Sequence, residues 1–148
     1  MLINWKRYGL ALFSCFIVVT VFDILWNAVL LRDVYIQTAR FWRPADELNR
    51  LVPLGFLILL AMMALMGLVF VRFGGLGIRQ GLEFGFLIGL MIFVGSFGLV
   101  TMVPWPKSLV AAMAFQSFIN NLLTGLFFGW LYKPAPMEVQ AARTQASM

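Results

Sequence analysis

The chain alternates long apolar runs with short polar segments. Four runs stand out, at residues 8–31, 51–71, 81–103 and 108–131. Each holds about 21–24 residues, which as an α-helix rising about 1.5 Å per residue crosses about 30 Å of hydrocarbon. The alternating pattern of a transmembrane β-barrel is absent from the sequence. The runs therefore predict an all-α fold: one transmembrane four-helix bundle, a single domain over residues 1–134.

The longest connection, residues 32–50, is not simply polar. Tyr35, Ile36, Ala39 and Trp42 fall on one helical face. This pattern predicts a short amphipathic helix lying in the interface plane between helices one and two.

Short sequence motifs mark where the other helices begin and end. Pro44 followed by acidic residues is typical of a helix start, so the second helix is expected to begin near Pro44. Tight turns are expected at 72–79 and 104–107. Arg79 and Glu83 have the spacing of an interfacial ion pair. The polar segment 135–148 is expected to be a disordered tail.

Composition identifies the solvent. Of the 148 residues, 62% are hydrophobic and 11% charged, whereas a soluble domain carries about 25% charged residues. A fold this small cannot hide so much apolar surface from water. Membrane lipids are therefore the expected surroundings.

The formal net charge of +5 changes this picture little. The Lys and Arg residues lie at the ends of the apolar runs, as anchors at a phospholipid surface do. Nucleic-acid binding is therefore not expected. These flanking residues are Lys6, Arg7, Arg32, Arg50, Arg72, Arg79, Lys107 and Lys133. Four helices put both termini on one side, and the Lys6–Arg7 pair favours a cytoplasmic side.

Aromatic residues support the same topology. Trp5 and Trp130 lie at the ends of the first and fourth runs, while Trp42 and Trp105 lie in the first and third connections. Tryptophan concentrates at membrane interfaces. Each pair is therefore expected at one face of the membrane.

The residue inventory restricts the chemistry. The chain has no His, and Cys15 is its single Cys. Histidine-ligated haem or zinc, His-based triads and an intramolecular disulfide therefore have no ligand, base or partner. We expect no catalytic residues, metal or cofactor. Cys15 is interpreted as a small apolar residue.

Glycines mark close packing in the last two helices. Small residues four apart let two backbones approach in lipid. The glycines at this spacing are Gly81, Gly85, Gly89, Gly125 and Gly129. They predict either internal helix packing or a docking face for a second copy or another subunit.

Polar residues inside the runs are the candidate site. Asp23 lies past the middle of the first run, where an ionisable group costs about 2.5–3.5 kcal/mol on insertion scales. Thr20 and Asn27 share its face, with Trp26 beside them. The fourth run supplies Gln116, Ser117, Asn120, Asn121 and Thr124.

Because the first and fourth helices run in opposite directions, Gln116 and Asn120 should lie near the depth of Asp23. We predict a polar seam in which amides donate to Asp23 and accept from Trp or hydroxyl groups. The seam either fixes the register of the bundle or forms a binding cavity or proton-linked site.

Three stretches carry a resemblance. Residues 25–44, 81–89 and 129–134 resemble an uncharacterised family of small bacterial four-span membrane proteins, over about residues 20–134. The resemblance implies this topology and a location in the bacterial inner (plasma) membrane. It implies no activity.

Two functions follow from these features. The first is a small non-enzymatic subunit or scaffold that forms a homo-oligomer or packs against a membrane protein partner. The alternative is small-molecule, ion or lipid binding or transport through the seam around Asp23. An intramembrane enzyme is disfavoured because no second carboxylate lies at that depth.

Overall fold

The computed structural model describes residues 3–102 and 104–134 and contains, in those ranges, helices and no strands. The long helices are α1 (Trp5–Leu25), α3 (Ala45–Arg72), α4 (Gly77–Ser96) and α6 (Lys107–Leu131). The short elements are the π-turn η1 (Trp26–Leu30), α2 (Arg32–Gln37), the 3₁₀ turn η2 (Ala39–Phe41) and α5 (Leu99–Met102). The predicted all-α four-helix bundle is confirmed. The predicted tail at 135–148 lies outside the described residues.

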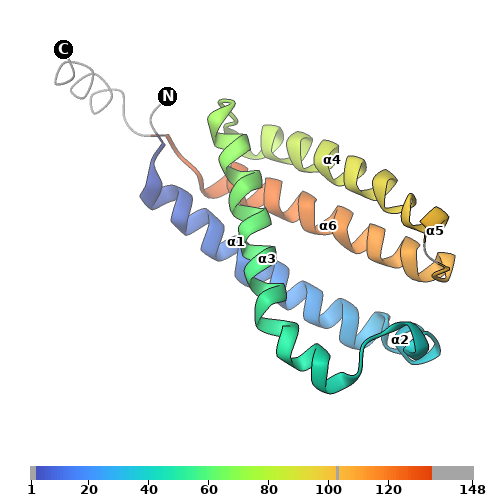
Figure 1. Cartoon of the computed structure of the whole chain (residues 1–148). Coiled ribbons are helices and arrows are strands. Elements are labelled where there is room, and N and C mark those ends of the chain that lie inside the picture. Colours follow the sequence, from blue (N-terminus) through green and yellow to red (C-terminus); the bar gives the residue numbers. More distant parts are fainter. Residues whose placement is uncertain (1–2, 103, 135–148) are drawn as a thin grey trace, which may run out of the picture.

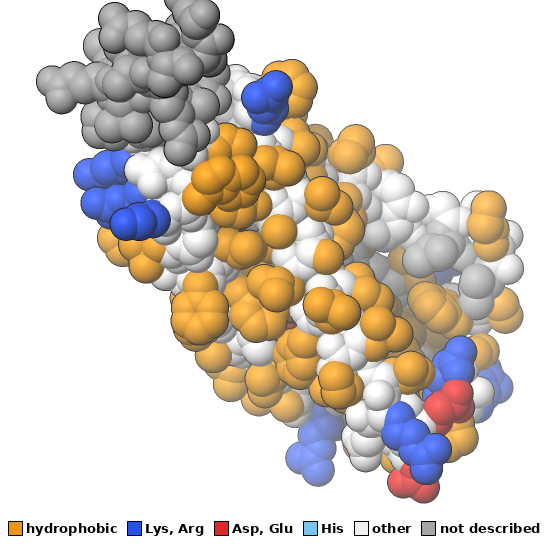
Figure 2. All heavy atoms as spheres, turned by 60° about the vertical axis from the view of Figure 1, so that its left-hand side comes forward, with side chains coloured by type: hydrophobic (Ala, Val, Ile, Leu, Met, Phe, Trp, Pro, Cys, Tyr) orange, Lys and Arg blue, Asp and Glu red, His pale blue; other side chains and the backbone are white. Residues whose placement is uncertain are grey.

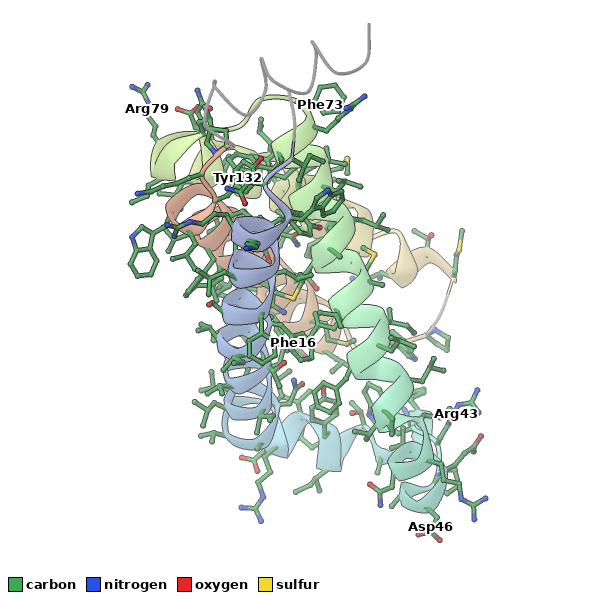
Figure 3. All side chains as sticks on the ribbon, turned by 90° about the vertical axis from the view of Figure 1, so that its left-hand side faces the viewer. Phe16, Arg43, Asp46, Phe73, Arg79 and Tyr132 are labelled. Atoms are coloured by element: carbon green, nitrogen blue, oxygen red, sulfur yellow. The ribbon has the colours of Figure 1, made fainter. Side chains whose placement is uncertain are left out.

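Four helical segments are long and apolar enough to cross a membrane: Trp5–Leu30, Ala45–Arg72, Gly77–Met102 and Lys107–Leu131. The chain is therefore a multi-pass membrane protein. Figure 2 shows apolar side chains over the middle of one face and charged ones gathered towards its ends. In Figure 3, Arg79 lies at one end of the bundle and Arg43 at the other.

The third run is not one continuous α-helix. The α-helix ends at Ser96, and the chain turns at residues 97–98 before α5 begins. The Ser96 hydroxyl donates to the Ile92 carbonyl at 2.8 Å. Gly98 lies in the turn, and Gly95 lies in the last helical turn before it. Side-chain bonding to the backbone and the high conformational entropy of glycine both weaken a helix.

The first connection has the expected helical parts. Helix α3 begins at Ala45, directly after Pro44, as predicted. A short helix, α2, does lie between the first two spans, followed by η2. That this unit lies in the plane of the membrane interface stays a prediction.

Helix α6 is the centre of the bundle, since it packs against α1, α3 and α4. Figure 1 shows α4 and α6 side by side, with α1 on the other side of α6 and α3 crossing the view from α2 to the start of α4. The start of α1 and the end of α6 lie at the same end of the bundle, where the Asn4 N–H donates to the Tyr132 hydroxyl at 3.5 Å. Which side faces the cytoplasm stays a prediction.

The five spaced glycines form the contact between α4 and α6. A Cβ added to Gly81 would lie 2.2 Å from the Gly125 carbonyl oxygen, and one added to Gly129 would lie 2.5 Å from that of Gly77. Gly85 and Gly89 are also buried against α6. Of the two interpretations of this stripe, internal packing is correct. A docking face there is excluded because the surface is already covered.

Helix α3 is attached mainly at its carboxyl-terminal half. The Phe128 ring lies directly on Gly67, where a Cβ would come within 2.1 Å of it. The Tyr8 hydroxyl donates to the Ala64 carbonyl of the same half. By contrast, every residue of α3 from 45 to 58 is exposed. Helix α3 therefore leaves the bundle as it approaches α2.

Charged pairs lie at the ends of the helices, as expected of interfacial residues. The Arg79 guanidinium contacts Glu83 at 3.0 Å, which confirms the predicted pair. Arg43 pairs with Glu47 at the opposite end. Both pairs are exposed, so each adds little to stability.

The glycine contact predicts a sharp difference between two substitutions. Gly125→Ala should destabilise the bundle by about 1–3 kcal/mol, because its methyl group overlaps the Gly81 carbonyl oxygen. Gly9→Ala is the control, since nothing lies within 4 Å of a Cβ at that exposed position. Unfolding in mixed detergent micelles, followed by circular dichroism, measures both. Equal stability of the two variants would contradict the packing.

Candidate functional site

The structure brings Asp23 together with Gln116 and Asn120. Gln116 Nε2 donates to Asp23 Oδ1 at 2.6 Å, and Asn120 Nδ2 donates to the same oxygen at 2.8 Å. All three side chains are partly buried. In the described part of the chain, no Lys or Arg forms an ion pair with Asp23. The carboxylate is therefore held by neutral donors, as predicted for the seam.

The opposite directions of α1 and α6 produce this meeting. At the start of α1, the Tyr8 ring packs on Phe128, with centroids 5.4 Å apart. Further along, Cys15 Sγ approaches Thr124 Oγ1 at 3.7 Å. Asp23 comes two turns after Cys15, which places it opposite the earlier residues of α6. The site thus begins where an apolar core of Cys15, Val19 and Met63 ends.

The other half of the predicted seam is formed in part. A hydroxyl donates to an amide at Asn27, which accepts from Tyr35, whereas Asn120 Oδ1 is buried with no partner among the described residues. Thr20 Oγ1 and Trp26 Nε1 are also buried and unpaired. The Trp26 ring instead packs between Phe22 and Phe115, at centroid distances of 5.4 and 5.9 Å. Native proteins leave few such groups, and each calls for an explanation.

Asn27 connects Asp23 to the first loop. Its Nδ2 donates to the Asp23 carbonyl oxygen at 2.7 Å, and its Oδ1 accepts from the Tyr35 hydroxyl at 2.6 Å. By taking a carbonyl of the helix, the Asn27 side chain competes with regular α-helical bonding. The backbone here widens into the π-turn η1, with Leu31 N–H bonded to the Trp26 carbonyl at 3.0 Å. Single π-turns of this kind are frequent at functional sites.

The loop side of the site is closed by aromatic rings. Tyr35 packs edge-on against Trp42 at 5.0 Å, and Trp42 stacks on Trp105 at 6.2 Å. The indole of Trp42 also donates to Thr38 Oγ1 at 3.0 Å. The first and third connections therefore meet at one face, as their tryptophans predicted. Burial raises the pKa of Tyr35, and the charge of Asp23 raises it further.

Two predicted site residues lie elsewhere. Asn121 does not contact Asp23: its Nδ2 donates to the Ser117 carbonyl at 2.7 Å, and its backbone lies against Gly85. Thr124 is buried and donates to the Asn120 carbonyl at 2.7 Å. Asn121 belongs to the α6 face towards α4, whereas Thr124 belongs to the face towards α1, where it meets Cys15.

Those faces border a groove of about 540 Å³ between α3 and α4. Its walls are apolar, and its floor is formed by four residues of α6: Ser117, Asn120, Asn121 and Thr124. Asp23 does not line it. Asn120 therefore takes part in both features, the seam on one side and the groove on the other.

The sequence alone did not indicate two parts of the site: Tyr35 at the seam and the methionines of the groove. Tyr35 lies eight residues after Asn27, across a π-turn that no helical periodicity predicts. Met62, Met63 and Met66 line the groove, but methionine in an apolar helix gives no signal of its own. Their spacing on one side of α3 becomes informative only once α4 is seen to diverge from it.

Comparison of the chain with protein-family models, with curated proteins and with solved structures found no match in any of the three. The resemblance to small bacterial four-span proteins therefore stays a prediction. Within the described residues, no group of three His, Cys, Asp or Glu side chains could hold a metal ion.

The link between Asp23 and Tyr35 predicts an alkaline titration. Asp23→Asn should lower the pKa of Tyr35, because the Asp23 charge that raises this pKa is lost. The pKa should stay above the ordinary value of 10.0, because Tyr35 is still buried. Nuclear magnetic resonance of ¹³Cζ-labelled tyrosine measures this, with Tyr35→Phe assigning the signal. Asp33→Asn is the control, since this exposed charge is not among the causes of the shift. An unchanged Tyr35 pKa in Asp23→Asn would contradict the coupling.

Proposed function

We propose that the chain is a non-enzymatic membrane protein that binds the polar group of a small molecule, an ion or a lipid at the seam of Asp23, Gln116 and Asn120. The observation that carries this proposal is the carboxylate itself. It lies inside a membrane span, is bonded by two amides through one oxygen, and has no ion-pair partner among the described residues.

A seam that only fixes register does not require this carboxylate. Neutral hydrogen bonds between transmembrane helices contribute about 0.6–2 kcal/mol each, whereas a centrally placed Asp costs about 2.5–3.5 kcal/mol. An Asn at position 23 would avoid the charge and still accept through its carbonyl oxygen. A ligand that bonds the carboxylate would explain why an Asp is kept inside the membrane despite this cost. Fixing the register of the helices would not explain it.

The surroundings support binding in a second way. Thr20, Trp26 and Asn120 each keep a buried polar atom that has no partner among the described residues. A rigid structural network would satisfy its members, because an unpaired buried group costs about 1–3 kcal/mol. A bound polar group beside Asp23 would supply partners for such atoms.

Purification from native membranes tests the proposal. Wild-type protein and Asp23→Asn are extracted in mild detergent, and their bound small molecules are identified by mass spectrometry. We expect a molecule that accompanies the wild type and is depleted from Asp23→Asn, because the variant keeps the size of the side chain and loses its charge. Asp33→Asn is the matched control and should retain the molecule.

Two outcomes would count against the site. One is an identical set of molecules at identical occupancy in the wild type and Asp23→Asn. The other is a wild type that carries no small molecule after extraction from its native membrane. Circular dichroism of both proteins separates loss of binding from loss of fold.

A second candidate function is self-association, or packing against a membrane partner, as a small subunit. The glycine stripe no longer favours it, since α4 and α6 use that stripe internally. A different observation does: all of α3 from residue 45 to 58 is exposed. A helix half that leaves its own bundle offers a second helix a surface within the membrane.

Cysteine cross-linking in native membranes tests this candidate. Leu57→Cys puts a thiol on the exposed half of α3, and Leu87→Cys puts one on α4 at a similar exposure of 65%, against 61%. Oxidation should give a disulfide-linked dimer with Leu57→Cys and not with Leu87→Cys. Equal cross-linking of both, or of neither, would remove the evidence for self-association through α3.

A further inference from the structure

The groove between α3 and α4 results from how the two helices separate. They are consecutive in the chain and joined by a short turn at residues 73–76, yet they diverge from that turn (Figure 1). Helix α6 closes the bottom of the space between them. The resulting cavity of about 540 Å³ lies in the range of small-molecule sites, roughly 300–1,000 Å³.

The walls of the groove suit an apolar body. On α3, Met62, Met63 and Met66 line it, and Ile88 and Ile92 face it from α4. Methionine side chains are flexible and polarisable, so they adapt to occupants of different shapes. Because Met62 is 56% exposed, the groove opens sideways to the surrounding lipid. An occupant can enter from the bilayer without passing through water.

The floor of the groove is polar and lies near the middle of α6, so an occupant meets hydrogen-bonding side chains there. Three floor side chains each donate one hydrogen bond inside the protein: Asn121 Nδ2 to the Ser117 carbonyl, Thr124 Oγ1 to the Asn120 carbonyl, and Asn120 Nδ2 to Asp23. Each carboxamide still has a second N–H, and the Ser117 hydroxyl takes part in none of these bonds. Asn120 Oδ1 has no partner among the described residues. The floor therefore offers both donors and acceptors to a polar group in the groove.

The charge of the occupant is restricted as well. None of the residues that line the groove is charged, and the groove lies within membrane-spanning segments. A charged group there would have neither an ionic partner nor water. A plain hydrocarbon chain would fill the volume but leave these polar groups of the floor without partners.

From these constraints we infer that the groove binds an uncharged, lipid-soluble molecule that carries a hydroxyl or amide group on an apolar body. The apolar body lies between α3 and α4, and the hydroxyl or amide group bonds the polar side chains of the floor. Asp23 is then a positioning residue, because its bond to Asn120 Nδ2 fixes the orientation of that carboxamide. This inference rests on the proposed function, since Asn120 belongs to both the seam and the groove.

Photolabelling in defined vesicles tests the inference. The full chain is reconstituted in phosphatidylethanolamine–phosphatidylglycerol vesicles with decanol, decylamide or decane, each carrying the same photoreactive diazirine. Labelled residues are identified by mass spectrometry. Decanol and decylamide should label the groove residues of α3 and α4 roughly two- to tenfold more than decane, the difference expected of one hydrogen bond.

Blocking variants give the matched control. Nothing lies within 4 Å of a Cβ at Gly55 or at Gly9, but only Gly55 lines the groove. Gly55→Phe should abolish the selective labelling, and Gly9→Phe should leave it intact. Met62→Trp, at another lining position, is a second blocking variant should Gly55→Phe fail to fold.

The outcomes separate this inference from the proposed function. Equal labelling by decane and decanol, or labelling unchanged in both blocking variants, overturns the inferred binding of a polar group in the groove. Labelling that Gly55→Phe removes and Asp23→Asn leaves intact supports the groove and counts against the seam as the polar anchor. Loss of a co-purified molecule in Asp23→Asn, without selective groove labelling, supports the seam alone.

Discussion

The backbone contact between α4 and α6 determines where every other helix can pack. In lipid there is no hydrophobic effect to drive helices together, so close van der Waals approach has to do so. At Gly81 and Gly125 the two backbones come so near that neither position has room for a methyl group. With that side of α6 occupied, α1 and α3 are left with its other sides. The polar residues of α6 are thereby divided between a face towards α1 and a floor beneath α3 and α4.

This division explains why one helix serves two features. Asn120 donates to Asp23 on α1 and also borders the groove. A change at Asp23 can therefore alter the orientation of a side chain that borders the groove. From Asp23, polar contacts continue through Asn27 to Tyr35 and end at the stack of Trp42 on Trp105. The backbone carbonyl of Asp23 is thus connected to the loop face through the side chains of Asn27 and Tyr35. The connection is local in sequence, although it extends from inside the membrane span to the loop face.

Much of the architecture could be predicted from the sequence, because lipid imposes strong rules. The lengths of the apolar runs gave the spans, and the glycine spacing gave the α4–α6 contact. Asp23 and its amide partners could be paired because antiparallel helices of known rise bring equal depths together. The limits of this reasoning are equally physical. Periodicity cannot show which of several amides faces which neighbour, and it assigned Asn121 to the seam when that side chain lies beside the groove.

Other features had no sequence signal at all. The divergence of α3 from α4 depends on packing at one end, at Gly67 against Phe128, and not on any residue in the groove. The break after Ser96 depends on glycines that also occur inside intact helices. The unpaired oxygen of Asn120 depends on how its carboxamide is turned when Nδ2 bonds Asp23. Such features come from three-dimensional packing that an apolar pattern only constrains.

The π-turn at Trp26–Leu30 has a consequence for the phase of the first span. A π-turn is equivalent to one residue inserted into an α-helix, and each residue of an α-helix turns the chain by about 100°. Residues before and after it are therefore out of phase by about that angle. The face that carries Cys15 and Asp23 does not continue in a straight line to Arg32. A single deletion within the turn would restore regular winding and swing the whole loop unit around the helix axis, even though no contact of Asp23 itself had been altered.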